Sequence, residues 1–348
     1  MAEYLIKDTT LTGIADAIRA KTGSTDPIVV SEMAGQIEGI ETGGGPVVLE
    51  SGTLNSGVTW IIDSNKVLTF SGNGAIDGFI YDDAPLSNYK AIIERIVINS
   101  GVTSIGSYAF YNWPAFTSVT IPDGVTSVGS CAFTGCTSLA SVTIPDGVTS
   151  IGDNAFDGCT SLASVTIPKS VTSVGAYVFQ KCTSLTSLTI SEGVTSIGVY
   201  AFYKCTSLTS VTIPKSVTSV GQCAFASCTS LASVTILGSV TSFGSSAFNG
   251  CTSLTSLTIS EGVTMVCGNM FQGCTSLTSV TIPKSVTRID ANAFMNCSAL
   301  TSIVFADTTT WYIGTSVGAT TTQIDVTDPA TNATNLVTTY RTSYWTKK

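Results

Sequence analysis

The sequence repeats one phrase at a fixed interval of 23 residues, and this period constrains the fold more than any other feature. Residues 205–227 read CTSLTSVTIPKSVTSVGQCAFAS, and residues 228–250 continue with CTSLASVTILGSVTSFGSSAFNG. A strict period of this length indicates a solenoid, because each repeat forms one coil whose apolar face is covered only when the next coil stacks on it. The phenylalanine of each repeat marks the period: Phe110, Phe133, Phe156, Phe179, Phe202, Phe225, Phe248, Phe271 and Phe294.

The apolar residues within one repeat predict short strands and no long helix. Leu208, Val211 and Ile213 end in strict alternation, which is typical of a strand with one buried face. Pro214 follows at the strand end, where its missing N–H is not needed. The segment 217–221 predicts a second short extended piece and a turn, and the Ala-Phe pair is expected to fill the coil from its far side. We expect about nine to ten coils, stacked about 4.8 Å apart.

The pattern C-x-x-L-x-x-V-x-I-P-x-x-V-x-x-I-G-x-x-A-F resembles the BspA-like, 23-residue branch of the leucine-rich repeat superfamily over residues 96–305. The resemblance implies a β-rich solenoid, a right-handed superhelix with N- and C-terminal caps. Proteins of this branch are typically bacterial surface proteins that bind host or partner-cell molecules. The resemblance therefore implies a cell-surface or extracellular location and a cell-surface protein or glycan as partner.

The segments that flank the repeats are expected to cap the two open ends of the stack. Residues 47–95 resemble the β-rich N-terminal cap of this family, and the alternating VTWII and KVLTF within them predict a hairpin. Residues 306–348 predict a C-terminal cap with strands at TTWYIG and TQIDV and a helix after Pro329. Its aromatic residues are expected to cover the last coil rather than to bind a ligand, and they are Trp311, Tyr312, Tyr340, Tyr344 and Trp345.

Residues 1–40 differ from the rest and predict a helical attachment or oligomerisation module, joined by a Gly-rich linker at 41–46. Leu11, Ile14 and Ile18 follow helical spacing, and two short helices cannot bury such stripes alone. The segment resembles a helical module of tail-associated phage and prophage proteins, which implies a phage-tail partner and a virion location. The N-terminus has no apolar core of a signal peptide, and none is expected. Removal of a signal peptide from a bacterial adhesin is the other explanation.

Composition argues against several classes of function. The net charge is −8, and only 11% of residues are charged, so no nucleic-acid partner is expected. No apolar run is long enough to span a bilayer, so membrane insertion is not expected. The chain has no histidine, so we predict no catalytic residues, no metal site, no cofactor and no enzyme activity. Asp325 and Asp328 are too few for a calcium loop, and Ser316, in a Gly-x-Ser-x-Gly match, lacks a base.

Eight of the eleven cysteines follow the repeat, one in each coil. Their side chains are expected to point inward in parallel, which suits buried thiols better than disulfides. Cys131, Cys223 and Cys267 lie outside this ladder, and the first two are expected to be partly exposed. The ladder consists of Cys136, Cys159, Cys182, Cys205, Cys228, Cys251, Cys274 and Cys297.

A row of charged residues follows the longer strands, and we interpret it as support for the register. Opposite charges mostly flank each other along the row, which predicts side-chain pairing between neighbouring coils. Its members are Asp123, Asp146, Lys169, Glu192, Lys215, Glu261 and Lys284, and the uncharged Gly238 occupies the position between Lys215 and Glu261.

The candidate ligand site lies where the repeat varies most, on either side of the Ala-Phe pair. Two consecutive coils there combine tyrosine, an amide and lysine, which suits a glycan or a protein loop. The alternative is that these are ordinary solvated turn residues, and a third possibility is a purely structural spacer or assembly protein. The candidate residues are Tyr177, Gln180, Lys181, Tyr200, Tyr203 and Lys204.

Overall fold

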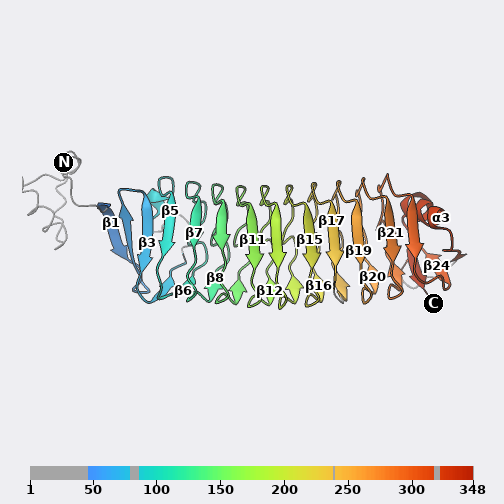
Figure 1. Ribbon diagram of the computed structural model, residues 1–348, viewed down its shortest axis with the longest axis horizontal. Coiled ribbons are helices and arrows are strands. Elements are labelled where there is room, and N and C mark those ends of the chain that lie inside the picture. Colours follow the sequence, from blue (N-terminus) through green and yellow to red (C-terminus); the bar gives the residue numbers. More distant parts are fainter. Residues whose placement is uncertain (1–45, 79–85, 238–239, 317–321, 348) are drawn as a thin grey trace, which may run out of the picture. The chain divides into compact units, whose positions relative to one another are not determined.

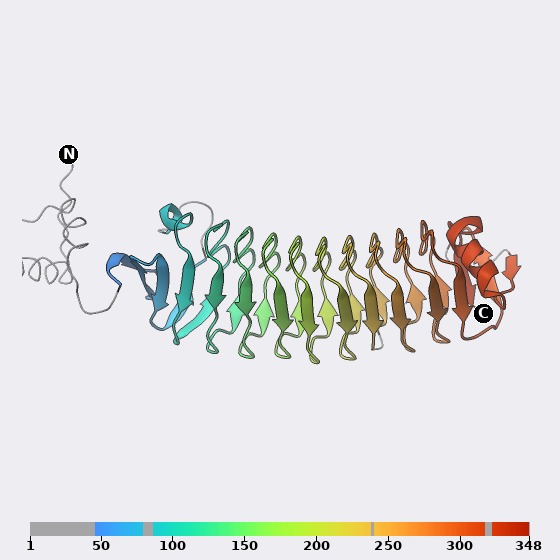
Figure 2. The ribbon, with the colours of Figure 1, turned by 45° about the horizontal axis from the view of Figure 1, so that its top comes forward.

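The computed structural model describes residues 46–78, 86–237, 240–316 and 322–347. The chain divides into two units, Met1–Val47 and Val48–Lys348. The helical module expected at 1–40 and the linker expected at 41–46, apart from Pro46, lie outside the described residues. The second unit is a β-solenoid whose coils stack along one axis (Figures 1 and 2).

Each coil contributes one longer strand and one short strand, as the alternation within a repeat predicts. The longer strands pair in parallel and in register, so that Ser164 faces Ser187 and Ile167 faces Ile190. The longer strands are β5 (Arg95–Ile98), β7 (Ser118–Thr120), β9 (Ser141–Thr143), β11 (Ser164–Ile167), β13 (Ser187–Ile190), β15 (Ser210–Ile213), β17 (Ser233–Ile236), β19 (Ser256–Ile259), β21 (Ser279–Ile282) and β23 (Ser302–Phe305). The short strands are β6 (Val102–Ile105), β8 (Ser127–Val128), β10 (Ser150–Ile151), β12 (Ser173–Val174), β14 (Ser196–Ile197), β16 (Ser219–Val220), β18 (Ser242–Phe243), β20 (Met265–Val266) and β22 (Arg288–Ile289).

The solenoid core is a column of phenylalanine rings, one from each coil, and we name each coil by its phenylalanine. From Phe110 to Phe294 the neighbouring rings lie with centroids 5.1–5.7 Å apart and within 20° of parallel. All nine rings are fully buried. The predicted column is therefore confirmed, and each ring is covered on both faces only inside the stack.

The eight ladder cysteines are buried free thiols, as expected. Each donates its S–H to the carbonyl of the phenylalanine in the preceding coil, at 3.0–3.4 Å. Burial raises the pKa of these thiols, for example that of Cys205 to about 12. They are protonated donors that tie coil to coil, and their burial leaves them unreactive.

A glycine in most coils allows the short strands to approach closely. A Cβ added to Gly221 would lie 2.5 Å from the backbone nitrogen of Val199, and one added to Gly198 would lie 2.3 Å from the oxygen of Gly175. Cys267 occupies the equivalent position in a later coil, and there the sheet of short strands is interrupted between β18 and β20. Its thiol donates to the carbonyl of Phe243 at 2.9 Å. In the glycine coils the short strands therefore stack too closely for a side chain, whereas Asp290 occupies the position directly after β22, which still pairs with β20.

The N-terminal end of the unit is a small antiparallel sheet that joins the solenoid. β1 (Val48–Thr53) pairs with β2 (Thr59–Asp63), and β2 pairs with β3 (Val67–Ser71) as the hairpin that the sequence predicts. β3 then pairs in parallel with β5, so strand pairing changes from antiparallel to parallel at this point. β4 (Gly74–Ile76) starts the sheet of short strands, and η2 (Ser87–Tyr89) is a short 3₁₀ turn.

The C-terminal residues cover the last coil. β26 (Tyr344–Lys347) pairs with β22, and β24 (Trp311–Gly314) pairs with β26 and with β25 (Thr322–Ile324). Trp311 and Trp345 are buried against Phe305, as expected of a cap. The elements that complete the cap are α3 (Pro329–Thr334), where the sequence predicts a helix, and the π-helical turn η3 (Asn335–Thr339).

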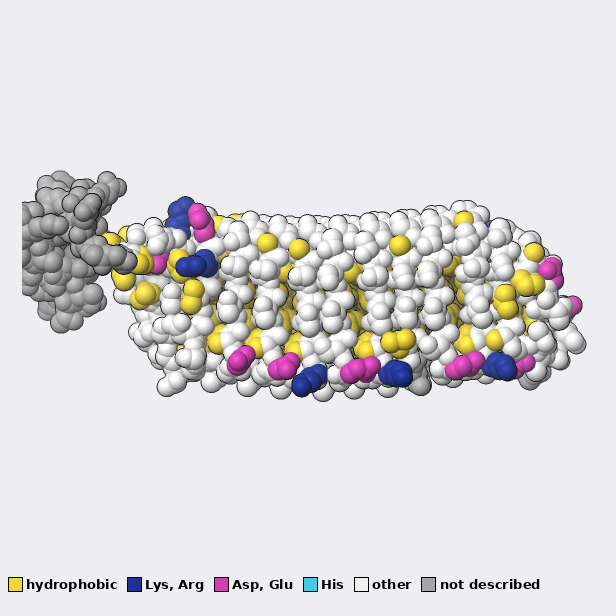
Figure 3. Space-filling view, viewed as in Figure 1, with side chains coloured by type: hydrophobic (Ala, Val, Ile, Leu, Met, Phe, Trp, Pro, Cys, Tyr) yellow, Lys and Arg dark blue, Asp and Glu magenta, His cyan; other side chains and the backbone are white. Residues whose placement is uncertain are grey.

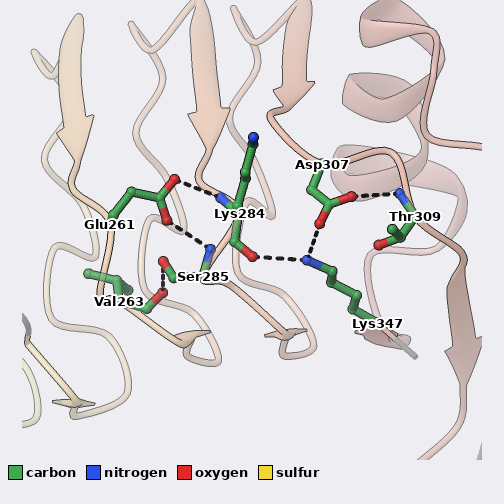
Figure 4. Close-up of polar contacts among 7 residues, drawn as sticks. All are labelled: Glu261, Val263, Lys284, Ser285, Asp307, Thr309 and Lys347. Atoms are coloured by element: carbon green, nitrogen blue, oxygen red, sulfur yellow. Dashed lines mark hydrogen bonds and ion pairs between the residues drawn. The ribbon is translucent and has the colours of Figure 1, made fainter.

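The charged row lies along one edge of the face shown in Figure 3, and its contacts differ from those predicted. Lys169 Nζ lies 4.0 Å from the carboxylate of Asp146, both of them exposed. Glu192 and Glu261 instead accept backbone N–H groups. Glu261 Oε1 accepts from the N–H of Lys284 at 3.1 Å, and Oε2 accepts from that of Ser285 at 3.0 Å, while the Lys284 side chain extends away (Figure 4).

These two glutamates stand where the ladder of longer strands is interrupted. Separate sheets end at β13 and at β19, the strands that precede Glu192 and Glu261. Glu192 accepts from the N–H groups of Lys215 and Ser216 at 3.2 and 3.1 Å. A carboxylate therefore links two coils where the longer strand is paired with the preceding coil but not with the next one. Backbone amides are better partners than a lysine ammonium, since they are already held in place.

Replacing Glu261 by alanine should lower the melting temperature of the protein and flatten the acid side of its stability profile. The backbone hydrogen bond from Lys284 is the main cause that lowers the pKa of Glu261 below 4.5. A lowered folded-state pKa stabilises the fold fully above pH 4.5, and this stabilisation is lost as pH falls through the lowered value. Thermal melts between pH 3 and 7 test this. Lys284→Ala is the control, and an equal loss there would contradict the amide contact.

Candidate functional site

Each coil turns around its Ala-Phe pair through two backbone positions in the left-handed region. The first position holds Tyr108, Cys131, Asn154, Tyr177, Tyr200, Cys223, Ser246, Asn269 and Asn292, with φ between 54° and 62°. The second holds Asn112, Gly135, Gly158, Lys181, Lys204, Ser227, Gly250, Gly273 and Asn296, with φ between 54° and 73°. Some of the positions that vary most between repeats are therefore also positions of left-handed backbone.

Left-handed backbone is unfavourable for residues other than glycine, and asparagine tolerates it best among the rest. Most coils follow this rule at the second position, where glycine and asparagine predominate. The Phe225 coil departs from the rule with Ser227. Two further consecutive coils depart from it and place a large side chain at both positions. They are the Phe179 coil, with Tyr177 and Lys181, and the Phe202 coil, with Tyr200 and Lys204. Among the nine described coils, only these two carry a large side chain at both left-handed positions, whereas the Phe110 coil carries one, Tyr108, at the first.

The three tyrosines predicted for the site form one aromatic cluster. The rings of Tyr177 and Tyr200 stack with centroids 5.2 Å apart and planes 4° from parallel. Tyr203 packs edge-on against Tyr200, at 5.2 Å and 89°. All three side chains are half-buried. The register of the solenoid thus brings together residues that are 23 positions apart in sequence.

The polar members of the predicted site surround this cluster. Lys204 places its ammonium 5.2 Å from the centroid of the Tyr203 ring, and both Lys181 and Lys204 are exposed. The amide of Gln180 donates to Asp157 in the preceding coil at 3.2 Å. We call Tyr177, Gln180, Lys181, Tyr200, Tyr203 and Lys204 the tyrosine-lysine patch.

The patch is bounded by a cysteine on one side and by carboxylates on the other. A hydrogen bond with the side chain of Cys223 raises the pKa of Tyr200, so this phenol remains protonated well into alkaline conditions. Cys223 and Cys131 are half-buried, as expected. In the Phe156 coil, Asp153 accepts from the N–H of Ala176 at 2.8 Å. The patch can therefore donate hydrogen bonds from phenols and ammonium groups.

A second tyrosine pair was not part of the predicted site. Tyr108 and Tyr111 pack edge-on at 5.6 Å in the Phe110 coil, and they are 38% and 39% exposed. The sequence signal was available, because both residues stand in the same variable columns as the patch. No lysine accompanies them, since the second left-handed residue of this coil is Asn112.

Asp325 and Asp328, the two acidic residues considered above for calcium, have structural roles. Asp328 caps the N-terminus of α3 by accepting from Ala330 and Thr331, and Asp325 accepts from the N–H of Thr327 at 2.8 Å. Within the described ranges, no group of three or more cysteine or acidic side chains is arranged to hold a metal ion. The same part of the chain contains no helix long and apolar enough to cross a membrane.

Comparison with known proteins gives a match that covers most of the chain. A family model described as the BspA type leucine rich repeat region, with six copies, matches residues 88–206 and 195–324. No curated protein is detectably similar in sequence.

Several solved structures are similar over most of their length. A leucine-rich repeat protein from Eubacterium ventriosum is 25% identical, with 73% of this chain and 85% of that chain covered and a TM-score of 0.43. A leucine rich cell surface protein from Faecalibacterium prausnitzii is 27% identical, with 76% and 96% covered and a TM-score of 0.35. A leucine-rich repeat protein from Bacteroides ovatus is 24% identical, with 76% and 88% covered and a TM-score of 0.38.

Proposed function

The chain belongs to the BspA-type leucine-rich repeat family, and from this premise we propose that it is a non-enzymatic recognition protein. The repeats form the scaffold, and the tyrosine-lysine patch is the surface that contacts a cell-surface glycan or protein. Adhesion or protein binding is the role that this type of repeat suggests. The absence of histidine from the sequence and the inert state of the ladder thiols favour binding over catalysis.

The observation that carries this proposal is the pair of coils that place a large side chain at both left-handed positions. Tyr177, Lys181, Tyr200 and Lys204 all stand at left-handed positions, where glycine or asparagine would fold with less strain. Strained backbone conformations cluster at functional sites, where they hold side chains in the orientation that binding requires. Tyrosine offers a large contact area and a hydroxyl at a low cost in side-chain entropy.

Replacing Tyr177, Tyr200 and Tyr203 together by alanine should reduce adsorption to cells, or binding on a glycan array, at least tenfold. Central aromatic residues commonly carry 1.4 kcal/mol or more of binding free energy, which corresponds to about a factor of ten. The side chains are half-buried at a surface turn, so the melting temperature should change little compared with a core substitution.

The matched control removes the other tyrosine pair, Tyr108 and Tyr111, from the same edge of the solenoid. This variant should bind as well as the parent. If the triple variant binds as well as the parent, the patch is not the binding site. If both variants lose binding equally, recognition extends along the edge and is not confined to the two coils.

We propose that residues 1–40 attach the recognition surface to its carrier. Their helical spacing and their resemblance to modules of tail-associated phage proteins support a phage or prophage tail as that carrier, and self-association is the other use of such a module. A bacterial adhesin is the alternative to the virion. The flanking genes distinguish them, since tail or baseplate genes support the phage and sortase or secretion genes support the adhesin.

A further inference from the structure

The tyrosine-lysine patch offers polar groups rather than open ring faces. Tyr177 and Tyr200 cover one face of each other, with planes 4° from parallel. Tyr203 meets Tyr200 edge-on and has the Lys204 ammonium near its ring. A sugar that stacked flat on one of the covered ring faces would have to displace these contacts. Hydroxyl and ammonium groups therefore remain as the main recognition elements.

The two lysines of the patch are unfavourable for the free protein. They are one coil apart, and like charges on neighbouring rungs repel each other. Both are at left-handed positions, with φ of 57° and 60°. Within the described residues, neither takes part in an ion pair. A bound anion would remove the repulsion, because it would lie between two positive charges.

The neighbouring carboxylates do not supply that anion. Asp157 accepts from Gln180 at 3.2 Å, and Asp153 accepts from the backbone N–H of Ala176. The six residues of the patch carry two positive charges and no negative one, with Asp153 and Asp157 at its border, in a chain of net charge −8. Such a chain does not attract polyanions in general, so an anionic ligand would be drawn to this place specifically.

The spacing of the patch fits a polysaccharide better than a peptide. Equivalent groups recur at one coil, and the two stacked tyrosines lie 5.2 Å apart, which is close to the length of one pyranose unit along a glycan. Side chains on one face of an extended peptide recur every two residues, at about 6.6 Å. A glycan that follows the solenoid axis would therefore meet one phenol and one ammonium group per sugar.

We propose, on the basis of the function assigned to this patch above, that its ligand is an acidic glycan. Two successive sugars lie over the Phe179 and Phe202 coils, and a carboxylate or sulfate group binds between Lys181 and Lys204. The Tyr177 phenol donates a hydrogen bond to one sugar, and the Tyr200 oxygen accepts one from the other. The Gln180 amide, held by Asp157, limits the site on the side of the Phe156 coil.

The test measures binding of the full chain to hyaluronate as a carboxylated probe, dextran sulfate as a sulfated probe and neutral dextran. Binding to at least one acidic probe should exceed binding to dextran tenfold or more and should weaken with added salt. The double variant Lys181→Gln, Lys204→Gln should lose at least tenfold in affinity for that probe. The control variant Lys169→Gln, Lys215→Gln removes the same charge from the row after the longer strands, and it should stay within twofold of the parent.

Several outcomes would overturn the proposal. Equal loss in the two lysine variants would mean that net charge alone is sensed. Equal competition by poly-glutamate would mean that the ligand is an acidic peptide. If neither acidic probe binds better than dextran, the ligand class is wrong. If neutral glycans bind and only the triple tyrosine variant loses them, the patch is a recognition site without an acidic ligand, and the proposed function survives.

A further variant separates a binding role of the lysines from a scaffold role. Lys181→Gly together with Lys204→Gly removes the charges and supplies the residue that other coils use at this position. The melting temperature should equal or exceed that of the parent, while binding to the acidic probe is lost. A fall of several degrees in melting temperature would show that these lysines support the scaffold, and it would count against the proposal.

Discussion

Replacing Phe202 by alanine is expected to lower the free energy of unfolding by about 3–5 kcal/mol, as for other fully buried aromatic residues. The Phe202 ring stacks between Phe179 and Phe225, with centroids 5.5 and 5.1 Å away. Its removal exposes a face of both neighbours and leaves a cavity in the middle of the column. Because coils contact only their neighbours, the column cannot close the gap from elsewhere.

Urea melts followed by circular dichroism would measure this loss, with Tyr111→Ala as a matched truncation of an exposed aromatic residue. Tyr111 is 39% exposed, so its removal should cost about 0.5 kcal/mol or less. A loss below about 1 kcal/mol for Phe202→Ala would contradict the role of the column as the core. A lower slope of the transition, rather than a lower midpoint, would indicate that the solenoid separates into two independently unfolding parts.

Adding one methyl group at Gly221 is expected to destabilise the protein by about 3 kcal/mol, in the upper range for an overpacked core. The new Cβ would lie 2.5 Å from the nitrogen of Val199 and 2.6 Å from the carbonyl carbon of Gly198. Both are backbone atoms, which cannot rotate away as a side chain can. The short strands would have to separate, and the bond from the Gly221 N–H to the Ile197 carbonyl, 2.8 Å long, would weaken.

Gly124→Ala is the control for this variant, because its Cβ would meet its nearest atom, the oxygen of Val102, at 3.5 Å. That substitution should lie within about 0.5 kcal/mol of the parent. If the two variants melt alike, the spacing of the short strands is not limited by the glycine. Cys267 shows how the chain accommodates a side chain at this position, since the short-strand sheet is interrupted there and the thiol bonds to Phe243.

The repeat alone determined the solenoid, the phenylalanine column and the inward thiols. A period of 23 residues allows one solution for Phe202 and its equivalents, because each coil can bury its apolar residues only against an identical neighbour. The caps were also predictable in outline. Alternation in KVLTF indicates a strand. The short C-terminal segment contains more large aromatic residues, Trp311 and Trp345 among them, than it could bury by itself, which indicates that they cover the last coil.

The tertiary structure decided the features that depend on backbone conformation and on which atom meets which. Sequence variation indicated the columns that hold Tyr177 and Lys181, but the left-handed backbone there follows from the turn that closes each coil. Charge alternation predicted side-chain pairs, whereas Glu261 accepts two backbone N–H groups of the next coil, at the point where β19 has no ladder pairing with β21. A one-dimensional pattern records residue types and spacing. It does not record which backbone N–H groups of the next coil lie within hydrogen-bond distance of Glu192 and Glu261.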